Sequence, residues 1–279
     1  MGCSESRKKI KFHIVKEIGK KKNTFCHRFL IRSENSNEEY AYKRVNIKAN
    51  EEEKKKILNY IEILKKINHP NVILLKGAYY SAQKKYLNII TEYADEGSLQ
   101  TKIDELNERN EKDETKEYLD ETTLINLLVQ ICLALKYIHK NNILHRDIKP
   151  SNIYLMKNNN DYIAKLGDFD VAKILSPTLK YTKTKVTTPQ YLAPEIIDNK
   201  EYDSKADIWS LGVTFYQLIT LSLPYEGNTE EEMKENIYKG NIMKIPKDCI
   251  IDSNFINLIN QMLSIKPDER PSAKEILEN

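Results

Sequence analysis

The sequence HRDIKPSN, His145–Asn152, and the sequence KLGDFDVAK, Lys165–Lys173, decide how the rest of the chain is interpreted. Between apolar residues they carry four polar side chains: Asp147, Lys149, Asn152 and Asp168. Two carboxylates, an amide and an ammonium group in two short loops are typical of sites that move a phosphoryl group, because that reaction needs positioning and charge neutralisation. These two loops are therefore the candidate functional site.

The composition describes a globular protein. With 279 residues, 40% of them hydrophobic and 30% charged, the chain can bury the core of one large or two small domains. Its 44 lysines and arginines nearly balance 41 aspartates and glutamates, so the net charge of +3 gives no global field that would attract nucleic acid. We expect no nucleic-acid partner.

The cysteines and the apolar stretches indicate where the chain works. Four cysteines lie far apart in the sequence: Cys3, Cys26, Cys132 and Cys249. They show no CxxC spacing and are too few for a disulfide framework, so they predict a reduced, cytoplasmic compartment. The longest apolar stretch, residues 124–138, is interrupted by polar residues and is shorter than the ~20 apolar residues of a membrane span.

Residues 1–11 form a candidate acylation segment. After removal of Met1, Gly2 becomes terminal and Ser6 occupies the serine position of the myristoylation signal. Cys3 can accept a palmitoyl chain, and the basic residues Arg7, Lys8, Lys9 and Lys11 follow. Because one myristoyl chain binds membranes only marginally, these features would supply the second signal that is needed. The segment predicts peripheral association with the cytosolic face of a membrane; an ordinary terminal tail is the alternative.

Residues 12–94 have the pattern of a small antiparallel sheet with one helix. Alternating or β-rich segments occur at 12–47, 72–80 and 86–93. Between them, residues 51–67 carry apolar side chains at three- to four-residue spacing, which predicts a helix that stops before His69-Pro70-Asn71.

After residue 95 the pattern becomes mainly helical. Residues 104–121 are charged and indicate a solvated helix end and loop, while residues 122–140 form a strongly amphipathic helix that leads directly into HRDIKPSN. The predicted fold class is therefore α+β, with a β-rich lobe at 12–94 and a helical lobe at 95–279.

Further motifs complete the pattern. In chain order they are YAYK at 40–43, EYADEGSL at 92–99, HRDIKPSN at 145–152, DFD at 168–170, APE at 193–195, DIWSLG at 207–212 and KPDERP at 266–271. This series resembles a protein kinase over residues 12–279, which implies a bilobal kinase-like fold. Within the kinases the chain most resembles the NIMA-related serine/threonine kinases, through EYADEGSL, YLDE at 118–121, KLGDF at 165–169 and TKTKVTTPQYLAPE at 182–195.

The resemblance implies transfer of the γ-phosphate of ATP to a serine or threonine of a protein substrate. Asp147 would be the catalytic base, and Lys149 would contact the γ-phosphate. Asn152 and Asp168 would be the metal ligands, whose oxygen atoms suit Mg²⁺. Lys149 together with Thr188 indicates the serine/threonine acceptor class.

The resemblance also implies an ATP site. Lys43 would pair with the α- and β-phosphates, and Glu92 to Ala94 would form the hinge that bonds adenine, with Thr91 at the gatekeeper position. Further ATP contacts are implied for Gly19, Cys26, Ala41 and Leu155. For the three apolar wall residues among these, simple core packing is the alternative.

Residues 168–195 would be the activation loop. Thr184 matches the position of the family's phosphorylated threonine, and Arg146 would be a bidentate partner for a phosphate on it. Beyond the loop, the resemblance implies a buried ion pair of Glu195 with Arg270.

Two more residues resemble the family's internal scaffold. Asp207 would hold the backbone of the HRD stretch, and Trp209 would anchor the central helix. A single core tryptophan is the simplest interpretation of Trp209, and the family role agrees with it.

Three features depart from the family pattern. The glycine-rich loop keeps only Gly19 and has Lys21 and Thr24 where glycines let backbone amides approach phosphates. Tyr60 occupies the helix position of a glutamate that would pair with the strand lysine, and Asp170 replaces the glycine after Asp-Phe. The complete catalytic and metal-binding set favours an active kinase; the departures favour a pseudokinase that acts as a membrane-tethered binding or scaffolding module.

Overall fold

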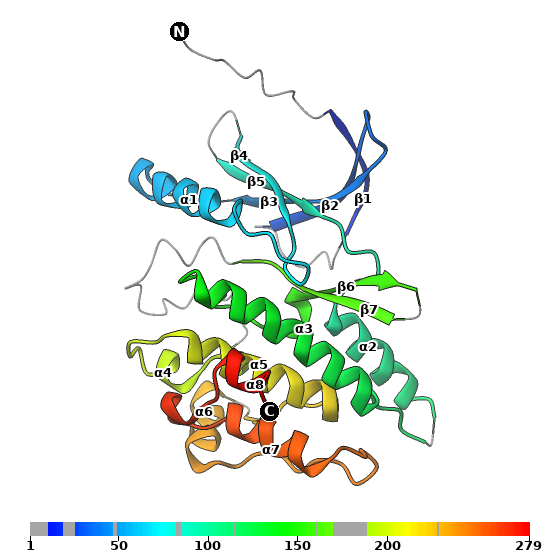
Figure 1. Ribbon diagram of the computed structural model, residues 1–279, viewed down its shortest axis with the longest axis vertical. Coiled ribbons are helices and arrows are strands. Elements are labelled where there is room, and N and C mark those ends of the chain that lie inside the picture. Colours follow the sequence, from blue (N-terminus) through cyan, green and yellow to red (C-terminus); the bar gives the residue numbers. More distant parts are fainter. Residues whose placement is uncertain are drawn as a thin grey trace. The chain divides into compact units, whose positions relative to one another are not determined.

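The computed structural model describes residues 11–18, 26–46, 49–81, 85–113, 115–159, 161–169, 189–227 and 229–279. The chain divides into two compact units (Figure 1). One contains the residues up to Asn68 together with Leu74–Ala94, and the other contains His69–Ile73 together with Asp95–Asn279. The short segment His69–Ile73 therefore belongs to the second unit, although it interrupts the sequence of the first.

A five-stranded antiparallel sheet dominates the first unit. In the order in which they pair, its strands are β1 (Phe12–Glu17), β2 (Cys26–Ser33), β3 (Glu39–Asn46), β5 (Tyr86–Glu92) and β4 (Leu75–Tyr80). The central strand β3 pairs on both sides, so that Ala41 lies opposite Leu30 and Thr91. Ala41 and Lys43 are two residues apart on β3 and therefore share one face of the sheet.

The helix of the first unit is α1 (Glu51–Leu64), which ends three residues before the expected position. A capping box fixes its start, because Asn50 accepts from the N–H of Glu53 while Glu53 accepts from the N–H of Asn50. Its apolar side is buried through Ile57, Ile61 and Leu64. One amphipathic helix with a sheet is what the sequence predicts for this unit.

The second unit is mainly helical. Its α-helices are α2 (Leu99–Asn110), α3 (Glu121–Lys140), α4 (Pro194–Ile197), α5 (Ser204–Thr220), α6 (Glu230–Lys239), α7 (Ser253–Met262) and α8 (Ala273–Ile276). The core helix is α5, in which Trp209 and Phe215 are fully buried. α3 is long and apolar enough to cross a membrane, but eight of its residues are buried within this unit, which identifies it as a core helix. The two units together confirm the predicted α+β, bilobal kinase-like fold class.

A two-stranded hairpin in the second unit was not predicted. Strand β6 (Ile153–Asn158) pairs with β7 (Asp161–Leu166) in antiparallel register, from Ile153 opposite Leu166 to Asn158 opposite Asp161. The signal in the sequence is a pair of six-residue segments rich in apolar side chains, IYLMKN at 153–158 and DYIAKL at 161–166, on either side of a polar turn. The hairpin matters because it joins the two candidate loops: β6 follows HRDIKPSN and β7 leads into DFD.

Candidate active site

The catalytic loop His145–Asn152 is held by the carboxylate of Asp207, in the first turn of α5. Its oxygens accept the backbone N–H groups of His145 and Arg146 at 2.9 and 2.8 Å. His139, at the end of α3, donates its Nε2–H to the same carboxylate at 2.9 Å. Burial raises the pKa of Asp207, but the hydrogen bond from His139 and the backbone donors outweigh that effect and leave the pKa below its ordinary value. Asp207 therefore stays ionised, and it holds the HRD backbone as the kinase resemblance implied, whereas the contact from His139 was not predicted.

These contacts stabilise an unusual backbone conformation. Arg146 has φ of +67°, in the left-handed region that costs an L-residue about 1–2 kcal/mol. Because Asp207 accepts the N–H groups of both His145 and Arg146, it fixes this turn directly. The turn determines the direction in which the next side chain, Asp147, leaves the backbone.

His145 is a buried structural residue. Its Nε2 lies 2.8 Å from the carbonyl oxygen of Gly167, which can only accept, so Nε2 carries the proton. Its Nδ1 accepts from the backbone N–H of Asp147 at 3.4 Å. The imidazole also packs against the ring of Phe169 with centroids 4.8 Å apart. This one histidine thus links the HRD loop to the DFD loop.

Asp147, Asn152 and Lys149 form a preassembled group. Asn152 is 3% exposed, and its Nδ2 donates both to the carbonyl oxygen of Asp147 at 2.7 Å and to Asp147 Oδ2 at 2.6 Å. Lys149 Nζ lies 2.9 Å from the same Oδ2. Because the amide nitrogen of Asn152 is used by Asp147, its Oδ1 is turned away from Asp147 and can act as a ligand. The structure brings these three predicted residues together.

Asp168 lies at the end of β7, with its own carboxylate held in place. Its φ is +57°, and its Oδ2 accepts the hydroxyl of Tyr154 on β6 at 2.9 Å. The preceding Gly167 packs closely, because a Cβ there would lie 2.7 Å from Ile73 and 3.0 Å from the ring of Tyr154. The backbone N–H of Gly167 donates to the carbonyl oxygen of Asn152 at 2.9 Å, which couples the two expected metal ligands. Tyr154 was not among the predicted residues, although it lies only two positions after Asn152.

The ATP-binding residues predicted in the first unit lie on its central strands. Ala41 and Lys43 are half-buried on β3, and Cys26 begins β2 opposite Val45. Glu92 ends β5, where its Oε1 accepts the N–H of Leu74 at 2.7 Å. A helix residue of this unit, Tyr60, is half-buried on α1.

Two further predicted ATP contacts are more deeply buried. Ala94, the last residue of the first unit, is 8% exposed. Leu155 on β6 of the second unit is 1% exposed, because side chains alternate along a strand and Ile153 and Leu155 turn to the core while Tyr154 turns away. Tyr154, by contrast, has the more exposed position and lies beside Asp168.

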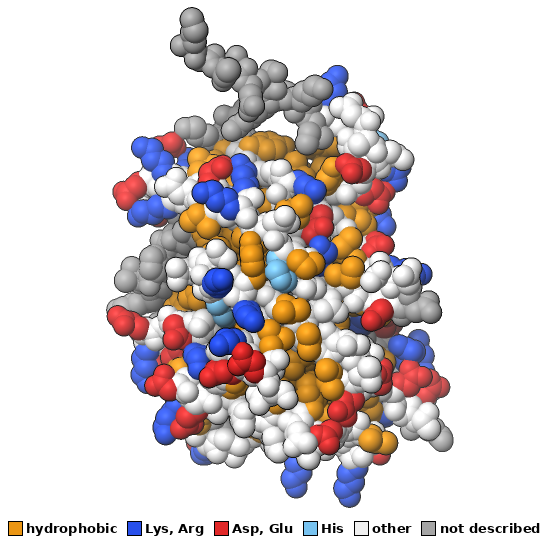
Figure 2. Space-filling model, in the orientation of Figure 1, with side chains coloured by type: hydrophobic (Ala, Val, Ile, Leu, Met, Phe, Trp, Pro, Cys, Tyr) orange, Lys and Arg blue, Asp and Glu red, His pale blue; other side chains and the backbone are white. Residues whose placement is uncertain are grey.

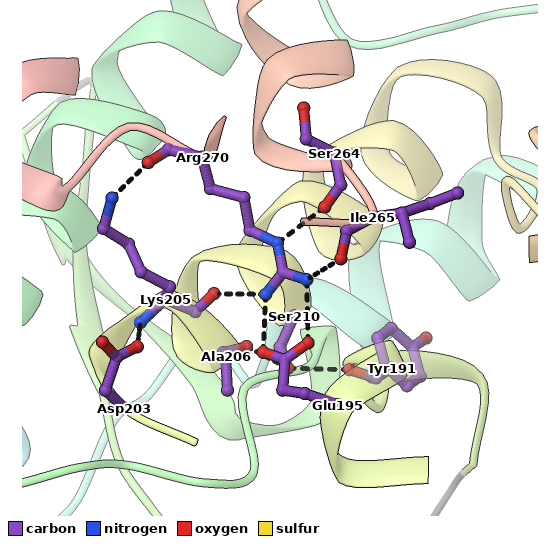
Figure 3. A network of polar contacts seen from close by, with 9 residues as sticks. All are labelled: Tyr191, Glu195, Asp203, Lys205, Ala206, Ser210, Ser264, Ile265 and Arg270. Carbon is purple, nitrogen blue, oxygen red and sulfur yellow. Dashed lines mark hydrogen bonds and ion pairs between the residues drawn. The ribbon is translucent and has the colours of Figure 1, made fainter. Parts of the chain in front are cut away.

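The predicted ion pair of Glu195 and Arg270 is confirmed (Figure 3). The guanidinium donates to both carboxylate oxygens, at 2.7 and 2.8 Å, and the Arg270 side chain is 0% exposed. Trp209 lies against it, with the guanidinium carbon 5.0 Å from the ring centroid. The pair anchors the APE segment to the end of the chain.

Several predicted residues lie outside the described part of the chain: Gly2, Cys3, Gly19, Asp170, Thr184 and Thr188. Positive and negative side chains are interspersed over the face shown in Figure 2, without a large area of one sign.

Comparison with known proteins identifies the class. The family model for the protein kinase domain matches residues 12–279, so the chain belongs to the protein kinase domain family. Among its relatives, serine/threonine-protein kinase Nek3 of Mus musculus is 33% identical over 266 residues, which cover 95% of this chain and 48% of the relative. Nek5 of Homo sapiens is 33% identical over 96% of this chain and 36% of the relative, and the probable kinase nek3 of Dictyostelium discoideum is 36% identical over 96% and 23%.

These relatives confirm the resemblance to the NIMA-related serine/threonine kinases. The chain spans about half or less of the length of the curated relatives it matches. What the shared region carries is the kinase domain itself, including the two loops described above.

Proposed function

We propose that the chain is a protein serine/threonine kinase that transfers the γ-phosphate of ATP to a serine or threonine of a protein substrate. The observation that carries the proposal is the preassembled group of Asp147, Lys149 and Asn152, on a loop whose backbone is fixed by Asp207. Phosphoryl transfer depends mainly on such positioning and on neutralising charge. The Nek relatives, which are named as serine/threonine kinases, support the same function.

In this mechanism Asp147 orients the acceptor hydroxyl and receives its proton. Asn152 and Lys149 both contact Oδ2 of Asp147, and these two contacts fix the orientation of the carboxylate. Lys149 stays beside the carboxylate and places a positive charge where the transferred phosphoryl group gains negative charge. Lys43 would hold the α- and β-phosphates from the first unit.

The residues present fit a hard divalent cation, for which we propose Mg²⁺. Asp168 offers a carboxylate held by Tyr154, and Asn152 offers an amide oxygen turned away from Asp147. Oxygen donors of this kind suit Mg²⁺ bound to nucleotide phosphates, and the ion would neutralise phosphate charge.

The pseudokinase alternative has no support among the described residues. The glycine-poor loop and Asp170 lie outside them, and the half-buried position of Tyr60 on α1 is compatible with packing. The deciding experiment measures transfer of labelled phosphate from ATP and Mg²⁺ to a serine-rich protein, followed by identification of the phosphorylated amino acid. Phosphoserine or phosphothreonine that disappears in Lys43→Met is expected; equal labelling by wild type and Lys43→Met would refute the proposal.

We further propose that the N-terminus is acylated on Gly2 and Cys3 and associates with a membrane surface. The support is the sequence MGCSES followed by basic residues. Intact-mass measurement after expression in a eukaryotic host should show an added myristoyl mass on Gly2 that is absent in Gly2→Ala. An unmodified wild-type terminus would contradict the proposal.

We also propose Thr184 as the regulatory phosphosite of the activation segment. The support is its position in the TKTKVTTPQYLAPE sequence and the presence of Arg146 beside the catalytic base. Phosphopeptide mapping of the active protein tests it, because Thr184→Ala should remove the activating phosphate, and full activity in that variant would exclude the role.

A further inference from the structure

Tyr154 lies on β6, between the two loops of the candidate active site, and its side chain reaches the second of them. Its hydroxyl is 2.9 Å from Oδ2 of Asp168. The phenol is the donor in this bond, because an ionised carboxylate only accepts. Asp168 has φ of +57°, so its carboxylate leaves the backbone from a left-handed turn, and the hydrogen bond from Tyr154 restricts where it points.

The backbone of Tyr154 is held on both sides. On one side it pairs with Lys165 of β7, and on the other it forms an isolated antiparallel bridge with Ser98, the N-cap of α2. The N–H of the next residue, Leu155, donates to the carbonyl oxygen of Gly97 at 2.9 Å, and the Leu155 side chain is 1% exposed. Hydrogen bonds on both sides and a buried neighbour leave the strand little freedom to move. The phenol therefore approaches Asp168 from a fixed position.

The ring of Tyr154 packs against the glycine that precedes Asp168. A Cβ at Gly167 would lie 3.0 Å from two ring carbons of Tyr154 and 2.7 Å from a side-chain carbon of Ile73. The ring thus fills the space in which most residues would have a side chain. Replacing Tyr154 with phenylalanine keeps this packing and removes only the hydroxyl, so the hydrogen bond can be tested separately from the packing.

The other expected metal ligand, Asn152, is also oriented by neighbouring groups. Asn152 is 3% exposed, and its Nδ2 donates to Oδ2 of Asp147 at 2.6 Å. Its carbonyl oxygen accepts the N–H of Gly167 at 2.9 Å, which links it to the residue before Asp168. Supporting hydrogen bonds of this kind set the orientation of metal ligands. Both expected ligands are therefore oriented by the protein itself.

Ligands with a fixed orientation favour an ion with a strict geometry. Mg²⁺ requires near-ideal octahedral coordination at about 2.0–2.1 Å, whereas Ca²⁺ accepts about six to eight oxygens at about 2.3–2.6 Å in a flexible arrangement. A carboxylate that can shift adapts to the larger ion, and a carboxylate held by a phenol adapts less. The hydrogen bond to Asp168 should therefore matter more for Mg²⁺ than for Ca²⁺.

We propose that Tyr154 is a specificity-determining residue of the metal site, whose hydroxyl positions Asp168 so that the site prefers Mg²⁺ to Ca²⁺. Tyr154 is a positioning residue, because it acts through Asp168 and not on the ion. The inference rests on the proposed kinase function and adds how the cation of that reaction is selected.

The test measures metal affinity of the full chain with saturating ADP, whose phosphates supply further oxygen ligands, so it needs no phosphate transfer. Bound Mn²⁺ is followed by electron paramagnetic resonance and displaced with Mg²⁺ or with Ca²⁺, which gives the dissociation constant of each ion. In Tyr154→Phe the dissociation constant of Mg²⁺ should rise about 5-fold, while that of Ca²⁺ should change less than about 2-fold. The matched control is Tyr162→Phe on β7, a half-buried phenol whose ring lies beside Lys102, and it should keep the wild-type preference.

Three results would overturn the inference. They are an unchanged preference for Mg²⁺ over Ca²⁺ in Tyr154→Phe, an equal loss of affinity for both ions, and a wild-type protein that binds no Mn²⁺. An equal loss would mean that the hydroxyl supports the site without selecting the ion. A chain that selects Mg²⁺ through Tyr154 but transfers no phosphate would contradict the kinase proposal and leave this inference in place.

Discussion

Replacing Arg270 with methionine should destabilise the second unit by about 3–5 kcal/mol, since removing one partner of a buried ion pair leaves the other charge uncompensated. The guanidinium is fully buried and makes two hydrogen bonds of 2.7 and 2.8 Å to Glu195. It also donates to three backbone carbonyl oxygens at 2.8–3.1 Å, those of Ser264, Lys205 and Ile265. The substitution therefore strands a carboxylate that is 6% exposed and three carbonyl groups.

Thermal unfolding followed by circular dichroism measures this effect. A loss of this size corresponds to a Tm lower by roughly 10 °C for a domain of this length. The double variant Arg270→Met/Glu195→Met should recover part of the loss, because it removes the stranded charge as well, with a coupling of about 0.5–3 kcal/mol. Lys266→Met, which removes an exposed ion pair with Glu269, is the control and should leave Tm unchanged.

Either of two results would contradict this prediction. A Tm of Arg270→Met within error of wild type would show that the buried pair does not anchor the fold. A double variant that is less stable than the sum of the single losses would show that the stranded carboxylate is not the source of the cost.

Three further predictions follow from individual contacts. Tyr154→Phe removes the hydroxyl that holds Asp168, so the affinity for Mn²⁺, measured by electron paramagnetic resonance, should weaken about 5-fold. The far-ultraviolet circular dichroism spectrum should stay the same, and an unchanged Mn²⁺ affinity would contradict the role of this contact. The pKa of Asp207 is lowered in the fold, so its ionised form stabilises the protein above the ordinary carboxyl pKa of about 3.9, and this contribution is lost as the pH falls towards the lower folded-state pKa. The difference in unfolding free energy between wild type and Asp207→Asn, measured by urea unfolding, should therefore shrink below about pH 4. A difference that stays constant with pH would contradict this prediction. Gly227→Ala places a methyl group 2.4 Å from a backbone nitrogen of α6, so Tm should fall, and an unchanged Tm would contradict the close approach.

The sequence predicted the fold class and the loops of the site because both depend on local patterns. Residues 51–64 show helical periodicity, and a capping box stands at the start of this helix. The loop His145–Asn152 carries its polar residues at fixed spacing. The role of Asp207 could be expected from the kinase resemblance, and its bonds to the HRD backbone are as expected.

Other features depend on contacts between distant segments, which a single sequence does not show. His139 reaches Asp207 across 68 positions, and only its place at the end of a helix before the HRD stretch hints at that contact. Tyr154 reaches Asp168 because β6 and β7 pair, whereas the sequence pattern after residue 95 predicts mainly helices. The burial of Leu155 depends on the same hairpin, because neighbouring residues of a strand face opposite sides of the sheet. Leu155 therefore faces the core, while Tyr154 lies beside Asp168.

We propose that Asp147 acts as the base of an active kinase. The most direct measurement is the initial rate of phosphate transfer from ATP to a serine-containing substrate by wild type and by Asp147→Asn, with Asp161→Asn, an exposed carboxylate at the start of β7, as the control. We expect Asp147→Asn to lower kcat about 10²- to 10⁴-fold, while Asp161→Asn keeps the wild-type rate. Equal rates for wild type and Asp147→Asn would contradict it.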